Sequence, residues 1–176
     1  MDVGSARKLT ERIYRRLNAR RPEIELDEKY YRGDQPLSFA TEEWKAANAE
    51  RYAGFSDNWC GTVVDAEAER LKPTGVTNLP KGAARMLWDQ LQMNEFDAQF
   101  SQGVRTALSA RRVFVIVWDD GDGDSLVTFE HPSNVEVEYE WENPRKRRAA
   151  LKTWVDEDTE FATLYTPDWL FKWERK

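Results

Sequence analysis

The sequence predicts an α+β fold, because two different hydrophobic periods divide the chain near residue 110. Residues 1–110 carry apolar side chains at helical spacing, whereas residues 111–176 alternate apolar and polar side chains as strands do. We therefore expect N-terminal amphipathic helices, residues 1–110, packed on a C-terminal antiparallel β-meander, residues 111–176. The two parts together are expected to form one domain.

The composition is that of a folded, acidic protein of 176 residues. Hydrophobic side chains make up 40% of the chain and include eight Trp and eight Phe, which is enough for a core of ordinary size. A net charge of −6 argues against a general nucleic-acid binder. Cys60, the single cysteine, excludes an intrachain disulfide and is expected to be a small core residue. Without a secretory signal or an apolar stretch of about 18 residues, the chain is predicted to be soluble and made in the cytosol.

The first predicted helix is amphipathic and basic. Leu9, Ile13 and Leu17 recur every four residues, which predicts a helix from about residue 6 to residue 18 that Pro22 ends. Arginines and a lysine occupy its other faces, which are expected to be solvated. A turn follows over residues 30–36, in which Gly33 takes a positive φ.

Four more helices are predicted from capping residues and helix breakers. Thr41 caps a helix that ends at Gly54, and Asp57 caps one that Pro73 ends. A short helix spans residues 83–92. Asn94 is expected to cap the last helix, in which Gly103 marks a close crossing with another element.

The strands follow from residue 113 onward. Residues 113–118 form a continuous apolar run, which predicts a strand covered on both faces that turns into a second strand at residues 126–130. The third strand is the clearest, because valine and aromatic residues alternate with glutamates over residues 135–142. The chain then returns through residues 145–155, and two short strands follow at residues 161–165 and 169–174.

The glutamates of the third strand form a ladder on one face. Arg145–Arg148 and Lys152 lie within cross-strand reach of that ladder, so a solvated, charge-paired surface is favoured over a divalent metal site. Replacing Glu138 by Gln is therefore expected to change stability by no more than about 0.5 kcal/mol. The ladder comprises Glu136, Glu138, Glu140 and Glu142.

Apolar stripes of both kinds are expected to share one core. Trp44, Trp59 and Trp88 each lie on an apolar helical stripe and are interpreted as core anchors rather than base-stacking platforms. The other predicted core residues are Leu9, Ile13, Val63, Leu71, Phe100, Val104, Phe114, Ile116, Val137 and Tyr139.

No catalytic, cofactor-binding or metal-ligating residue is predicted, and the chain is not expected to be an enzyme. Asp120, Asp122 and Asp124 alternate as in a calcium loop, but Ser125 and His131 stand where that loop needs Gly and Glu. His131 is the only histidine and has no nucleophile at a telling spacing, so a structural hydrogen bond is expected of it. Phosphate-loop, dinucleotide and nucleophile-elbow motifs are absent from the sequence.

Short segments along the whole chain resemble the N-terminal part of tailed-bacteriophage portal proteins of siphovirus type. Their order and spacing match that family, although each segment is structural rather than catalytic. The segments are Tyr30-Tyr31-x-Gly33-x-Gln35-Pro36-Leu37, Asn58 with Val63-Val64 and Arg70-Leu71, Asn94–Asp97, Ala107–Ser109 with Arg112–Trp118, Glu130–Val137, Ala150–Trp154 and Thr163–Asp168.

The resemblance implies a structural component of the phage portal, the ring at one capsid vertex through which double-stranded DNA is packaged and ejected. It implies a homo-oligomer, commonly a dodecamer, in the virion, with assembly in the host cytoplasm. Major capsid or scaffold protein would be a partner, and terminase large subunit and a head-tail adaptor would dock on other segments. Family members continue through stem, clip and crown segments, so residues 1–176 are expected to be the outer wing and, alone, to be monomeric or weakly associated.

Two other functions remain open from the residues alone. An accessory nucleic-acid-binding protein would use the arginine-rich first helix, and its DNA affinity would fall steeply with salt. A hydrolase would need a divalent ion on the glutamate ladder.

Overall fold

A computed structural model describes residues 1–34, 41, 43–44, 46–48, 58–119, 121 and 123–176. The chain contains helices, a four-stranded antiparallel sheet and a two-stranded antiparallel sheet, which confirms the α+β fold. It divides into two compact units, residues 1–24 with 113–176 and residues 25–112. We call these the sheet unit and the helical unit. The predicted division at residue 110 into two parts of one domain stays a prediction, but the first 24 residues group with the strands.

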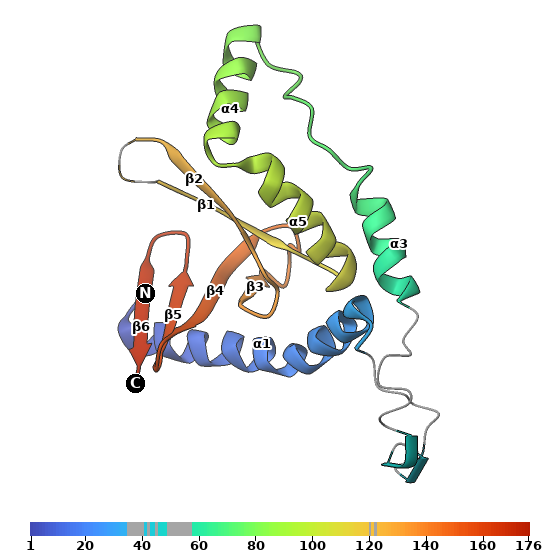
Figure 1. The fold of residues 1–176 in the computed structure, drawn as a ribbon. Coiled ribbons are helices and arrows are strands. Elements are labelled where there is room, and N and C mark those ends of the chain that lie inside the picture. Colours follow the sequence, from blue (N-terminus) through green and yellow to red (C-terminus); the bar gives the residue numbers. More distant parts are fainter. Residues whose placement is uncertain (35–40, 42, 45, 49–57, 120, 122) are drawn as a thin grey trace. The chain divides into compact units, whose positions relative to one another are not determined.

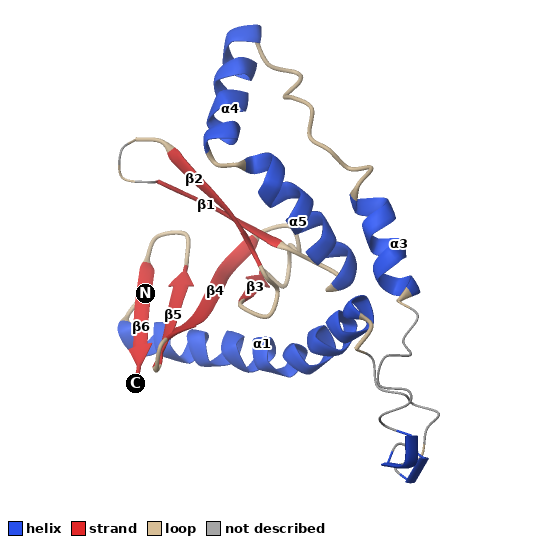
Figure 2. Cartoon of the chain, viewed as in Figure 1, coloured by secondary structure: helices blue, strands red, loops and turns tan. Residues whose placement is uncertain are grey.

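The sheet unit contains all six strands (Figure 2). β1 and β2 form a hairpin, and β3 to β6 form a meander in which each strand pairs with the next. Every strand lies within about two residues of its prediction, except that the third ends before residue 142. The bounds are Phe114–Asp119 (β1), Ser125–Glu130 (β2), Val135–Tyr139 (β3), Arg147–Asp156 (β4), Thr159–Tyr165 (β5) and Leu170–Arg175 (β6).

The first two-thirds of α1 covers one face of the four-stranded sheet (Figure 1). α1 spans Val3–Arg32 and buries one stripe of apolar side chains at intervals of three and four residues. Leu9 and Ile13 pack there on Leu151 and Leu164, neighbours across β4 and β5. This contact is the core of the sheet unit.

The hairpin of β1 and β2 contacts the opposite face of the meander. The Trp118 ring meets the Tyr165 ring edge-on at 6.0 Å, and Lys152 forms an ion pair with Glu130. Val127, Val135 and Val137 are buried. The prediction that β1 is covered on both faces was wrong, since Val115 and Val117 are exposed.

Pro22 lies inside α1 and does not end it, which corrects the predicted helix of residues 6–18. A proline in a helix interior costs about 3 kcal/mol. Packing on both sides of the proline offsets this cost, because Leu17 and Ile24 are buried and Arg20 and Arg21 bond to the sheet unit. The turn predicted from residue 30 therefore begins only at Gly33, whose φ of 80° is positive as expected.

Among its described residues, the helical unit includes the end of α1, short helical stretches at residues 43–44 and 46–48, and the helices α3 (Trp59–Ala68), α4 (Lys81–Met93) and α5 (Phe96–Ser109). The Thr41 hydroxyl accepts a hydrogen bond from the Trp44 amide, as a cap does, but Gly54 and Asp57 lie outside the described residues. Asn58 caps α3 instead of Asp57. Asn94 ends α4 rather than capping α5, because Glu95 takes a left-handed conformation between the two helices.

The predicted core list is confirmed only in part. Leu9, Ile13 and Val137 are buried, and Phe100, Val104, Phe114 and Ile116 are half-buried. Val63, Leu71 and Tyr139 are exposed, as are Cys60 and Trp59, and these predictions were wrong. Trp88 is half-buried, whereas Trp44 is 36% exposed, so its prediction as a core anchor was also wrong.

Candidate functional site

Three arginines of α1 bind two glutamates of β3 across the sheet unit. Arg12 forks onto both Glu138 carboxylate oxygens, at 3.1 Å from Nε and 2.6 Å from Nη2. Arg16 and Arg20 hold the two oxygens of Glu136 at 2.7 Å and 2.6 Å. We call these five residues the arginine clamp. Charge-assisted pairs of this kind fix orientation as well as contributing energy.

The clamp corrects the prediction of a solvated glutamate ladder. Glu136 is 1% exposed and Glu138 is 7% exposed, because Glu136 pairs across the sheet with Leu151 and shares the face that α1 covers. Two of the predicted cross-strand pairs are confirmed, since Lys146 lies 2.8 Å from Glu140 and Arg148 lies 3.5 Å from Glu138, whereas Lys152 binds Glu130 instead. The contact joins segments more than 100 residues apart, so neither local pattern alone predicts it.

The sequence does contain a signal for the clamp, which is the similar spacing of arginines along α1 and of glutamates along β3. Four residues of helix advance about 6 Å, and two residues of strand advance about 6.6 Å. The step from Arg12 to Arg16 on α1 therefore matches the step from Glu138 to Glu136 on β3, and Arg20, one helical step further, also binds Glu136. Guanidinium groups aligned in this way neutralise a row of carboxylates that would otherwise be too costly to bury.

Arg21 binds the turn that precedes β3. Its Nε donates to the Ser133 carbonyl at 2.9 Å, and its Nη2 lies 3.2 Å from the Thr153 hydroxyl on β4. Within the same turn, His131 Nδ1 lies 2.6 Å from the Ser133 hydroxyl. The predicted structural hydrogen bond of His131 is confirmed.

A second polar cluster joins three helices of the helical unit. The Tyr31 hydroxyl donates to Asp65 at 3.0 Å, and Arg105 from α5 donates to the same carboxylate oxygen at 3.0 Å. Asn58 caps the Gly61 amide and donates to the Tyr31 carbonyl at 2.6 Å. Burial, and then the hydrogen bond to Asp65, raise the pKa of Tyr31.

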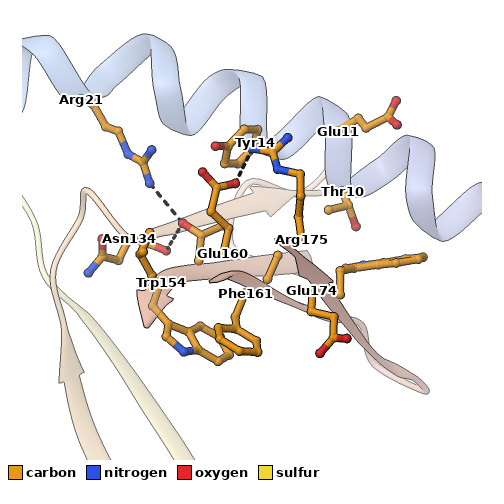
Figure 3. A pocket seen from close by; sticks show the side chains of 14 residues that line it. Thr10, Glu11, Tyr14, Arg21, Asn134, Trp154, Glu160, Phe161, Glu174 and Arg175 are labelled. Atoms are coloured by element: carbon orange, nitrogen blue, oxygen red, sulfur yellow. Dashed lines mark hydrogen bonds and ion pairs between the residues drawn. The ribbon is translucent and has the colours of Figure 1, made fainter. Parts of the chain in front are cut away.

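A cavity of about 240 Å³ lies between α1 and the strands β4, β5 and β6 (Figure 3). Tyr14 and Arg21 enter it from α1, whereas Trp154 and Phe161 lie together on the far side of the strands. Glu160 and Arg175 form an ion pair at its edge. Trp173 also lines the cavity, and its indole Nε1 finds no hydrogen-bond acceptor among the described residues.

These clusters hold elements of the fold together. Within the described part of the chain, no group of three or more His, Cys, Asp or Glu side chains is placed to hold a metal ion. The calcium-like spacing falls partly on Asp120 and Asp122, which lie outside the described residues. No described helix is long and apolar enough to cross a membrane.

Comparison with known families identifies a portal family. The model of the family described as phage portal protein, SPP1 Gp6-like, matches residues 10–176. No curated protein matches the chain.

Proposed function

Because the chain belongs to the SPP1 Gp6-like family of phage portal proteins, we propose that residues 1–176 form the outer, wing-like part of a portal subunit. Portal proteins are structural components of the capsid vertex used for DNA packaging, and they are not enzymes. The family implies an oligomeric ring in the virion. The observation that carries the proposal is the match over residues 10–176, which includes both the helical and the sheet unit.

The arginine clamp supports this role through its mechanical effect. A ring component must keep its shape under the forces of packaging, and α1 is held to the sheet by a buried apolar core and a row of ion pairs side by side. Loss of the arginines would leave the glutamates buried without partners, and loss of the apolar contact would expose hydrophobic side chains to water. We propose that the sheet unit acts as a rigid block within the ring.

The charge distribution supports passage of double-stranded DNA rather than tight binding of it. The net charge is −6, and the guanidinium groups of Arg12, Arg16 and Arg20 are paired with Glu136 and Glu138. Phosphate binding by those arginines would first have to break buried pairs. This disfavours the alternative of an accessory nucleic-acid-binding protein that uses the first helix.

The specific partners are part of the proposal. Further copies of the chain would complete the ring, in a number that is commonly twelve in this family, and major capsid or scaffold protein would surround it. Terminase large subunit and a head-tail adaptor would dock elsewhere on the assembled portal. The protein would meet these partners in the host cytoplasm during assembly and remain at the portal vertex of the virion.

Co-expression with the capsid protein and electron microscopy test the function. A tagged chain is expected at one vertex of each particle, detected by a gold-labelled tag antibody and by asymmetric reconstruction of the vertex. A chain spread over all vertices, or absent from particles, would overturn the portal assignment. Capsid protein expressed with an unrelated tagged protein is the control.

A further inference from the structure

Trp141 is 90% exposed, more than any other large hydrophobic side chain that the structure describes. It lies in the turn between β3 and β4, and hydrogen bonds fix the shape of that turn. The Glu140 amide donates to the Lys146 carbonyl at 2.9 Å. The Arg145 amide donates to the Asn143 side chain at 3.1 Å. The indole is therefore held out on an ordered turn, which lowers the entropy cost of binding. We call Trp141 the knob.

The cavity between α1 and the strands β4, β5 and β6 has the size of one indole (Figure 3). A cavity of roughly 150 Å³ holds a benzene ring, whereas sites for drug-sized ligands commonly have about 300 to 1,000 Å³. At about 240 Å³ this cavity lies between the two. Its wall includes Tyr14, Ala162 and Trp173, which offer aromatic and apolar contacts to an incoming ring. We call this cavity the socket.

Basic side chains surround the knob. Residues 139–148 contain four basic and two acidic side chains. Arg145 and Arg147 are exposed, and neither forms an ion pair with a residue that the structure describes. A chain of net charge −6 thus carries a locally positive surface at this turn.

Acidic side chains surround the socket. Residues 155–160, which start at its wall, contain four acidic side chains and no basic one. Glu174, also on the wall, is exposed. The arginines of the socket are already engaged, Arg175 with Glu160 and Arg21 with the Ser133 carbonyl. The surroundings of the knob and of the socket are therefore electrostatically complementary.

We propose that the knob of one copy of this chain occupies the socket of a second copy. Trp141 cannot fill the socket of its own chain, because its turn precedes Arg147, and the socket wall at Thr153 is six residues, about 20 Å, further along β4. The contact joins two unlike surfaces, so it is head-to-tail and every copy carries one of each. Size and charge identify the occupant, so the inference goes beyond the proposed function and does not depend on it.

A knob of one side chain makes a small contact. A buried Trp contributes about 150 to 250 Å², whereas a stable interface buries about 800 Å² a side. Trp and Arg are, however, the residue types that most often dominate binding energy when they fill pockets. We therefore expect the isolated chain to associate weakly and to lose most of that association when Trp141 is removed.

Three variants of the full chain separate the two halves of the contact. Trp141→Ala removes the knob and keeps the socket, whereas Ala162→Phe fills the socket and keeps the knob. Trp169→Ala is the matched control, because it removes another exposed indole of the sheet unit that does not line the socket. Circular dichroism and urea denaturation check folding. Trp141→Ala is expected to be as stable as the wild type, because its side chain is exposed.

Sedimentation velocity up to millimolar concentration measures the association. We expect the wild type to associate, Trp141→Ala to weaken association by at least about tenfold, and Trp169→Ala to stay within about twofold of the wild type. Added salt should also weaken the wild-type association, because it screens the attraction between arginines and carboxylates.

Mixing two variants tests the head-to-tail geometry. Ala162→Phe alone should associate as weakly as Trp141→Ala, but an equimolar mixture of the two should form dimers and nothing larger, because one knob and one socket remain matched. If Ala162→Phe does not fold, the comparison of Trp141→Ala with Trp169→Ala still decides.

Three results would overturn the inference: a wild type that stays monomeric at millimolar concentration, a mixture that stays monomeric although both variants fold, or undiminished association of Trp141→Ala. The last would leave the socket to another occupant, such as a small aromatic molecule or a different protein. None of them removes the portal assignment, which fails only if the chain is missing from the capsid vertex.

Discussion

Glu136 and Glu138 show how a charged residue is kept inside a small protein. Each carboxylate is almost fully buried, and each accepts hydrogen bonds from guanidinium groups whose outer edges remain in water. The arginines are about half exposed, so their own desolvation is limited and part of the Coulomb attraction is screened. The main energetic consequence is that removing a carboxylate leaves its arginines unpaired against an apolar core.

Replacing Glu138 by Gln is expected to lower the free energy of unfolding by about 1 to 3 kcal/mol, because the forked pair with Arg12 loses its charge. Urea denaturation measures the change. This replaces the earlier expectation of an effect within about 0.5 kcal/mol, which assumed a solvated carboxylate. Glu142→Gln, at an exposed position of the same ladder, is the matched control and should stay within about 0.5 kcal/mol.

Tyr31 is expected to ionise above its ordinary pKa of 10.0, because burial and the hydrogen bond to Asp65 favour the neutral phenol. A folded-state pKa raised in this way gives stability that is fully present below about pH 10 and is lost as pH rises through the folded-state value. The ultraviolet absorbance titration of the wild type minus that of Tyr31→Phe isolates this group. A Tyr31 component that titrates below pH 10 would contradict the hydrogen-bonded cluster.

At the scale of elements, the local sequence pattern predicted where the strands lie. Which faces are covered and where α1 ends depend on tertiary contacts. Alternation placed the ends of β4 and β5 within about two residues, since side-chain period is a property of the strand itself. The same alternation gave the wrong environment for Glu136, because whether a face is covered depends on α1, more than 100 residues away. The prediction that Pro22 ends the first helix failed for a similar reason, because tertiary packing on both sides of the proline outweighs its local cost to the helix.

The crossing of α3 with the end of α1 depends on Gly61. A Cβ atom there would lie 2.8 Å from the Tyr31 carbonyl oxygen and 2.7 Å from Asn58 Nδ2, too close for either to remain in place. Gly61→Ala is therefore expected to destabilise the fold by about 1 to 3 kcal/mol, measured by urea denaturation.

Gly82→Ala is the matched control for that substitution. Gly82 also lies in a helix, but nothing stands within 4 Å of its added methyl group. Ala has the higher helix propensity, so this variant should be stabilised by about 0.5 to 1 kcal/mol. Equal effects of the two substitutions would show that the close approach at Gly61 is misplaced.

At the scale of the whole molecule, the distribution of charge agrees with the proposed structural function. The chain is acidic, and three arginines of α1, Arg12, Arg16 and Arg20, are engaged in internal ion pairs. The family assignment and the pairing pattern are independent observations. The net charge and the ion pairs of α1 both disfavour tight binding of DNA by this helix.

The isolated chain is expected to bind duplex DNA more weakly than about 10⁻⁴ M at physiological salt, where general DNA-binding proteins show about 10⁻⁴ to 10⁻⁶ M. Fluorescence anisotropy with a labelled duplex, repeated at several salt concentrations, measures it. Micromolar affinity that falls steeply with salt would favour the accessory nucleic-acid-binding protein. Glu138→Gln, which frees Arg12, should bind DNA slightly more tightly than the wild type.

The arginine clamp also constrains when the protein can fold during its synthesis. Arg12 and Glu138 are 126 residues apart, and the core beneath them is incomplete until Leu164 has been made. At about 5 to 20 residues per second, α1 is complete roughly 7 to 26 s before Leu164 has been made. During that interval its apolar stripe lacks the strands that cover it in the folded protein.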